Sequence, residues 1–179
     1  MLERAASAPN VTYRIGSAEG LPIEDKSCDL IGVGSALHWF DQDRFLAEAS
    51  RVAKPSTWLV VHDHWFGGQM EGVDAFGEWA RGVYLERYPS PPRDRSWRPP
   101  ADLSEWRHIG WERYEHPIRF DPDDLANYLL TQSNLQVVIE RGDQTPSQLK
   151  RWLLDEVEQF FESDSAVFEF GGFVACHHR

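Results

Sequence analysis

Residues 28–61 read CDLIGVGSALHWFDQDRFLAEASRVAKPSTWLVV, and the order of patterns in this stretch decides the fold class. Residues 28–33 are almost entirely apolar and too few for a helix, so they predict a buried strand. Residues 41–53 carry apolar side chains at helical spacing behind Asp41, a residue type that caps helix N-termini. Residues 57–61 predict a second strand. Two strands joined through a helix predict a parallel sheet with a right-handed crossover.

The core should lie on these two strands. Central strands of a parallel sheet are covered on both faces, so their side chains are buried on both sides. The predicted buried set is Cys28, Leu30, Ile31, Val33, Leu59, Val60 and Val61.

The remaining elements follow from capping residues, breakers and apolar periodicity. The predicted helices cover 2–8, 71–88, 121–130 and 146–162; the predicted strands cover 11–15, 112–120 and 166–176; a loop covers 17–27 and a proline-rich connection covers 89–100. We expect a single domain with core strands in 1–66, a helical and proline-rich insertion in 67–111, and C-terminal strands and helices in 112–179.

The composition is typical of a folded, acidic protein. The 179 residues are 41% apolar and 13% aromatic, which does not fit a disordered chain. There are 29 acidic and 18 basic residues, so the net charge is −11. Nonspecific binding to nucleic acids or to anionic membranes requires a cationic face, and the sequence has no basic patch. We therefore expect neither kind of partner.

The sequence also indicates a compartment. Cys28 and Cys176 cannot make a disulfide framework, and both lie in apolar runs, which predicts buried thiols in a reducing environment. The first residues lack the apolar core of a signal peptide, and no window suits a membrane-spanning helix. These features predict a cytoplasmic protein. The terminal His177-His178-Arg179 is interpreted as a tail without a functional role.

Four short motifs in a fixed order carry a resemblance to a known family. They are Gly16-Ser17-Ala18-Glu19-Gly20-Leu21-Pro22, Ser27-Cys28-Asp29-Leu30, Ala36-Leu37-His38-Trp39-Phe40-Asp41 and Glu48-Ala49-Ser50-Arg51-Val52-Ala53-Lys54-Pro55. Together they resemble the class I S-adenosylmethionine-dependent methyltransferases, in the methyltransferase-11-like branch that includes trans-aconitate methyltransferase-like proteins. The resemblance implies an α/β fold with an incomplete Rossmann-like sheet, mostly parallel, with helical insertions and an antiparallel C-terminal strand.

The resemblance implies cofactor-binding residues as well. Ser17 and Ala18 match the loop that meets the adenine of S-adenosylmethionine, although most relatives have Asp where Ser17 stands. Gly34 and Ser35 match the end of a strand whose backbone faces the methionyl group. Trp39 matches an aromatic residue over the cofactor, and it could equally be a packing residue.

Candidates for the chemistry and for the methyl acceptor come next. His38 is the candidate catalytic residue, because a neutral imidazole that titrates near pH 6.5 can act as a general base. It could also be a structural histidine beneath an aromatic lid. His64 and Trp65 follow the second strand, where substrates of α/β proteins bind, and are expected to contact the acceptor.

Two other kinds of site compete with this interpretation. His62-Asp63-His64 has residue types that bind divalent metals, but no distant third ligand is identifiable, so no metal site is predicted. Gly32-Val33-Gly34 resembles part of a dinucleotide fingerprint, but Leu37 stands where the third glycine is needed.

Part of the family pattern has no match within the 179 residues. In relatives a strand, a G-x-G-x-G turn, a helix and a second strand ending in an acid precede the matched motifs. Residues 1–5 resemble the helix that follows this acid. The turn and the acid hold the methionyl and ribose parts of the cofactor. The resemblance therefore predicts that calorimetry at up to about millimolar ligand will detect no binding of S-adenosylmethionine by this chain alone.

Two functions stay open. The first is an S-adenosylmethionine-dependent methyltransferase that acts on a small molecule, such as a carboxylate or a natural-product intermediate. The second is a non-catalytic methyltransferase-like module that has lost cofactor binding and works through a partner or a homodimer. The missing turn favours the second for the chain as it stands. Because the flank of residues 28–34 would be bare, we also expect a homodimer that buries the surface near 11–16 and 28–34.

Overall fold

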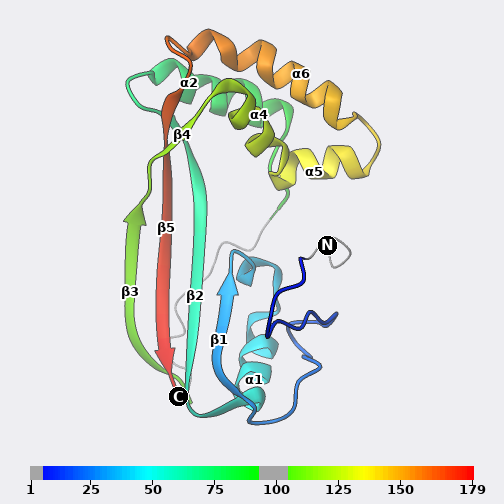
Figure 1. The fold of residues 1–179 in the computed structure, drawn as a ribbon, viewed down its shortest axis with the longest axis vertical. Helices are drawn as coiled ribbons and strands as arrows, with labels where there is room; N and C mark the ends of the chain where they lie inside the picture. The colour runs from blue at the N-terminus through cyan, green and yellow to red at the C-terminus, as the bar shows by residue number, and fades with distance from the viewer. Residues whose placement is uncertain (1–5, 93–104) are drawn as a thin grey trace. The chain divides into compact units, whose positions relative to one another are not determined.

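The computed structural model describes residues 6–92 and 105–179 and contains a five-stranded sheet with helices (Figure 1). The strands are β1 Cys28–Gly34, β2 Ala53–Met70, β3 Arg107–Glu115, β4 Ile118–Phe120 and β5 Ala166–His178. The helices are α1 Gln42–Val52, α2 Asp74–Trp79, α3 Leu85–Arg87, α4 Pro122–Leu130, α5 Ser133–Glu140 and α6 Pro146–Val157. Shorter helical turns are η2 Leu37–Trp39, the π-helix η3 Ala80–Tyr84, and η4 Glu158–Phe160. The predicted α/β class is confirmed.

The described residues form two compact units. The first contains residues 6–62, 105–111 and 174–179, and the second contains 63–92 and 112–173. Across the described ranges, no helix has both the length and the apolar character that crossing a membrane requires.

The sheet has the order β1-β2-β5-β3, and β4 also pairs with β5. The predicted parallel pair is confirmed, because β1 and β2 run in parallel with Leu30 opposite Trp58 and Val33 opposite Val61. This pair and the connecting helix α1 are the elements that residues 28–61 predicted.

The C-terminal strand is antiparallel, as expected, but it lies inside the sheet between β2 and β3. Backbone hydrogen bonds join Glu71 to Val167 at 2.9 Å and Arg179 to Thr57 at 3.0 Å, so β5 runs opposite to β2. Figure 1 shows β3 running opposite to β5 as well. Because β5 lies between β2 and β3, its pairings with both of these strands are antiparallel. Among the described strands the sheet is therefore more antiparallel than the resemblance implied.

The core of the first unit covers only one face of β1. Val33, Leu59 and Val61 are buried as predicted, together with Phe45, Ala49 and Val52 of α1. Leu30, in contrast, is 63% exposed. Successive side chains of a strand point to opposite faces, so Leu30 and Val33 lie on different sides of β1. The expectation that both faces are covered is wrong for this strand.

The ends of the chain also differ from expectation. Residues 11–15 are not a strand, and Ile15 is 85% exposed. Alternation alone cannot make a strand without a neighbour to pair with. Residues 6–8 are not helical, while residues 2–5 of the predicted first helix and 93–100 of the proline-rich connection lie outside the described residues.

The C-terminal residues are not a tail. β5 runs to His178, and the His177 side chain is completely buried. Arg179 donates to the Ala53 carbonyl at 2.8 Å and to Glu105 at 3.1 Å. These contacts anchor the end of the chain within the first unit, which a sequence of two histidines and an arginine did not suggest.

Two helices of the second unit, α4 and α6, begin where the sequence predicted. Asp121 caps α4 by accepting from the backbone of Asp124 at 2.7 Å. Thr145 and Gln148 form a reciprocal capping box at the start of α6. The helix expected over 71–88 consists of α2, η3 and α3, and the π-helix turn buries Tyr84. The sequence analysis missed α5.

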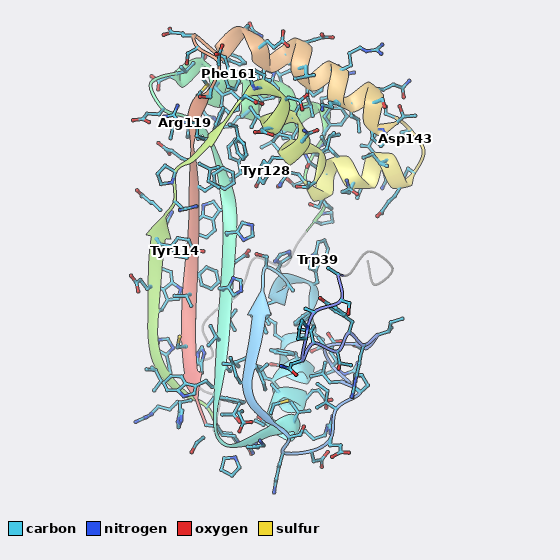
Figure 2. The ribbon with its side chains drawn as sticks, viewed as in Figure 1. Trp39, Tyr114, Arg119, Tyr128, Asp143 and Phe161 are labelled. Atoms are coloured by element: carbon cyan, nitrogen blue, oxygen red, sulfur yellow. The ribbon has the colours of Figure 1, made fainter. Side chains whose placement is uncertain are left out.

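Aromatic side chains dominate the core of the second unit. Its buried members include Phe76, Trp79, Tyr84, Tyr88, Phe168 and Phe170, with Phe66, Phe120, Tyr128, Trp152, Phe160 and Phe161 packed against them. Tyr128 and Phe161 are labelled in Figure 2. Phe120 stacks on Tyr128 with ring centroids 5.6 Å apart, one of many such contacts. Aromatic pairs add about 0.5–1.5 kcal/mol each beyond burial, so this cluster should be a stable body.

Candidate functional site

The loop at 17–27 is held against α1 by one arginine. Arg51 donates to the carbonyl oxygens of Leu21 and Ile23 at 3.2 and 2.9 Å. It also pairs with Glu48 at 2.6 Å, and Glu48 accepts from the backbone N–H of Leu21 at the same distance. The loop is therefore fixed by charge-assisted hydrogen bonds, which are about twice as strong as neutral ones.

The ionisation of Glu48 keeps this attachment insensitive to pH in the physiological range. The hydrogen bond from Arg51 lowers the pKa of Glu48 to about 2, against partial burial, which raises it. The carboxylate thus remains charged at any pH at which the protein would act, and the loop stays attached.

Ser17 and Ala18 lie in a tight turn at the start of this loop. Gly20 donates its backbone N–H to the Ser17 carbonyl at 3.2 Å and closes the turn. The Ser17 hydroxyl donates to the Glu19 carboxylate and accepts from the Glu19 N–H at 3.3 Å. Ser17 is exposed and Ala18 is half-buried, so both can be reached by a ligand.

The same carboxylate links the turn to the segment that follows η2. The backbone N–H of Asp41 donates to Glu19 Oε1 at 2.9 Å. Asp41 comes directly after the residues 36–40 that include His38 and Trp39. The structure therefore brings the predicted adenine loop next to this segment within the first unit.

Gly34 and Ser35 end β1, and His62 of β2 lies against them. Ser35 donates its backbone N–H to the His62 carbonyl at 2.9 Å and has a left-handed φ of 48°, which non-glycine residues rarely adopt. A Cβ on Gly34 would lie 2.7 Å from His62 Nε2, so only glycine leaves room for the imidazole. The sequence alone does not predict that His62 lies against Gly34. Its position opposite Gly34 in the parallel register is the signal that places it here.

His38 and Trp39 lie on the short turn η2. Leu37 is buried and anchors this turn, while His38 is half-buried and Trp39 is 58% exposed. The two rings are 5.1 Å apart and tilted by 48°. Figure 2 labels Trp39. An exposed indole beside an imidazole offers an apolar surface next to a group that can accept a proton.

His64 and Trp65 belong to the second unit. They are consecutive on β2, so their side chains point to opposite faces of the strand. Trp65 lies across Gly171 of β5, where a Cβ would come within 2.8 Å of the indole, and Arg113 lies 5.3 Å from its ring centroid. A ligand on one face of β2 would therefore meet only one of these two side chains directly.

Metal ligands do not cluster in the described ranges. Within residues 6–92 and 105–179, no group of three His, Cys, Asp or Glu side chains is arranged to hold a metal ion. Cys28 and Cys176 are free, half-buried thiols.

Comparisons with known proteins find similarity to methyltransferases. Residues 1–61 match the family model of a methyltransferase domain. An uncharacterized methyltransferase of Mycobacterium tuberculosis is 28% identical over 170 residues, which are 93% of this chain and 62% of that protein. One from Schizosaccharomyces pombe is 48% identical over 53 residues, or 30% of this chain and 21% of that protein. Residues 1–61 thus match a methyltransferase domain, and the chain is similar to methyltransferases over most of its length.

The structural comparison agrees with this assignment at the level of the fold. A candidate type II methyltransferase from Anaeromyxobacter dehalogenans superimposes with a TM-score of 0.64 at 22% identity, covering 99% of this chain and 74% of that one. The chain spans 62% of the length of its mycobacterial relative.

Proposed function

We propose that this chain forms part of an S-adenosylmethionine-dependent methyltransferase that acts on a small molecule. One observation carries the proposal: the hydrogen bond from Asp41 to Glu19 joins the Ser17–Gly20 turn to the segment of His38 and Trp39. A turn suited to adenine thus lies beside a candidate base. The match of residues 1–61 to a methyltransferase domain supports this assignment of the parts.

The residues present fit the adenine side of the cofactor. Ser17 offers a hydroxyl, Ala18 a small apolar surface, and Trp39 an exposed ring on which a planar base could pack. Gly34 is exposed and Ser35 lies at the strand end, so this backbone could approach the methionyl part. When bound, the cofactor supplies an electrophilic methyl group on a sulfonium.

His38 would prepare the acceptor for methylation. A neutral imidazole can remove the proton from an oxygen or nitrogen nucleophile, which contributes about 10²–10⁴-fold to a rate. The rest of the acceleration would come from holding acceptor and donor in line. Contact of the acceptor with His64 or Trp65 stays a prediction from the sequence.

Titration with S-adenosylhomocysteine, followed by NMR, tests the proposal. We expect chemical-shift changes that saturate at the amides of Ser17 and Ala18 and at the Trp39 indole, with a dissociation constant on the order of millimolar. Losing the contacts of the glycine turn and the ribose acid, at about 1.5–3 kcal/mol each, accounts for such weak binding. No change at these residues at ten-millimolar ligand would contradict the proposal, and micromolar binding would show that other residues replace those contacts.

A second experiment distinguishes the methyltransferase hypothesis from the hypothesis of a non-catalytic module. The chain would be joined to the upstream strand–turn–helix–strand segment of a relative, and methyl transfer to a panel of small carboxylic acids measured. Transfer that His38→Ala slows by about 10²-fold or more supports the enzyme with His38 as base. Tight cofactor binding without transfer to any acceptor tested would favour the non-catalytic module.

We further propose that the chain self-associates through β1. This strand ends the sheet order, Leu30 is 63% exposed, and its register partner Trp58 is 41% exposed. The one charge on β1, Asp29, pairs with Lys54 at 2.7 Å. In a chain with a net charge of −11, an electrically neutral edge suits a second copy of itself.

Sedimentation velocity across a wide concentration range tests this association. We expect dimers of the unaltered chain and monomers of Leu30→Lys. Val83→Lys provides a matched control, because Val83 is 43% exposed on the second unit and should not affect the dimer. A strictly monomeric unaltered chain would contradict the proposal.

A further inference from the structure

We propose that Glu19 is a positioning residue that fixes the adenine-side turn against the segment of His38 and Trp39. This inference rests on the proposed function and deepens it, since it names what would hold the two halves of that site in register. Glu19 itself need not touch cofactor or acceptor.

The two carboxylate oxygens of Glu19 accept hydrogen bonds from two different parts of the chain. Its Oε1 accepts from the backbone N–H of Asp41 at 2.9 Å, and its Oε2 accepts from the Ser17 hydroxyl. The Glu19 N–H donates back to Ser17 Oγ at 3.3 Å. One side chain therefore bonds to the turn at 17–20 and to the chain just after η2. Removing it would release both attachments together.

The helix that begins after Asp41 explains why a remote acid is needed. Asp41 caps α1 by accepting from the backbone N–H of Arg44 at 3.2 Å. In a capping box, the residue three positions after the cap accepts in return from the N–H of the capping residue. Here that residue is Arg44, whose side chain has no acceptor. Glu19 takes this place from 22 residues upstream.

Helix α6 shows the ordinary arrangement in the same chain. There Gln148 stands three residues after the capping Thr145 and accepts from its N–H at 2.8 Å. The box closes locally, so it connects α6 to nothing else. At α1 the reciprocal bond comes from the loop, and the capping interaction becomes a tie between two parts of the candidate site.

The charge of Glu19 suits this role. The hydrogen bond from Ser17 lowers the pKa of Glu19 below its ordinary value of 4.5, and the bond from Asp41 lowers it further. Glu19 is thus ionised at neutral pH. A folded-state pKa below the unfolded value means that the tie is fully present above pH 4.5 and is lost as the pH falls through the lowered pKa.

Amide hydrogen exchange on the full chain tests the tie directly. In Glu19→Ala the amide of Asp41 should exchange about ten-fold faster or more, as expected when a hydrogen bond to a charged group is lost. Glu19→Gln keeps an acceptor for Asp41 and should stay within about three-fold of the unaltered chain. Glu24→Ala, an exposed acid in the same loop, should change nothing. Equal protection of Asp41 in Glu19→Ala would overturn the inference.

The positioning role has a second readout. S-adenosylhomocysteine should bind Glu19→Ala at least about five-fold more weakly than it binds the unaltered chain. Glu19→Gln should bind it as the unaltered chain does. The free energy of unfolding of the two variants should stay similar. Equal losses of affinity in both variants would overturn positioning. If the unaltered chain shows no response to this ligand, the proposed function fails, and the exchange of the Asp41 amide still decides whether the tie exists.

Discussion

Replacing Phe168 with alanine should lower the free energy of unfolding of the second unit by about 3–5 kcal/mol. Phe168 is completely buried on β5. Its ring lies 5.2 Å from that of Phe76 and 5.9 Å from that of Phe120, so one side chain joins α2 to β4. Truncation removes the burial of the ring and leaves a cavity that well-packed neighbours cannot fill.

Urea unfolding followed by near-UV circular dichroism measures this loss. Phe161→Ala is the matched control, since Phe161 is half-buried at the edge of the same cluster, 5.8 Å from Phe168 (Figure 2), and should cost clearly less. If Phe168→Ala does not fold, Phe168→Leu provides the measurement, with an expected loss of about 1.5 kcal/mol. Losses for Phe168→Ala no greater than for Phe161→Ala would contradict the central role of this residue.

Local chemistry explains which elements the sequence could predict. The caps Asp41, Asp121 and Thr145 each bond within three residues, and their helices begin where expected. The apolar run at 28–33 and the β-branched run at 57–61 pair in parallel as predicted. These signals depend only on near neighbours along the chain. They can therefore be recognised from the sequence without knowledge of the three-dimensional structure.

The errors in the sheet involve partners that are distant in sequence. Leu30 is apolar like its neighbours, and only the sheet determines that its face of β1 is open. Residues 11–15 alternate like a strand but find no strand to pair with among the described residues. The place of β5 between β2 and β3 depends on pairing with strands that are distant in the sequence, which periodicity does not encode.

In the candidate site, too, the sequence predicted local features and missed contacts between distant residues. Family motifs pointed to Ser17, His38 and Trp39 by their order alone. Glu19 and Arg51 lie inside those motifs, yet their roles depend on bonds to Asp41 and to the loop carbonyls. Such contacts become visible only when loop and helix are placed together.

The buried His177 leads to a pH-dependent prediction. Its Nε2 lies 3.3 Å from Nδ1 of His108, and its Nδ1 finds no hydrogen-bond partner in the described part of the chain. Burial lowers the pKa of His177, and the neighbouring His108 lowers it further. Two imidazoles so close cannot both be charged without repulsion. The nearby Arg179 adds positive charge, although it is paired with Glu105.

The direction of the pH effect follows from linkage. The pKa of His177 is lower in the folded state than the unfolded value of about 6.5, so the unfolded chain binds this proton first. The stabilisation is complete above pH 6.5 and is lost as the pH falls through the folded-state pKa. For one proton the loss is at most about 1.4 kcal/mol per pH unit.

Urea unfolding at several pH values between 7.5 and 5 should reveal this loss. We expect the free energy of unfolding of the unaltered chain to fall more steeply toward pH 5 than that of His177→Gln, which has no imidazole to protonate. His178→Gln is the matched control, because the neighbouring His178 contacts Trp58 and should leave the slope unchanged. If His177→Gln kept the full slope, the loss would have to come from other groups, and the His108–His177 pair would not be its source.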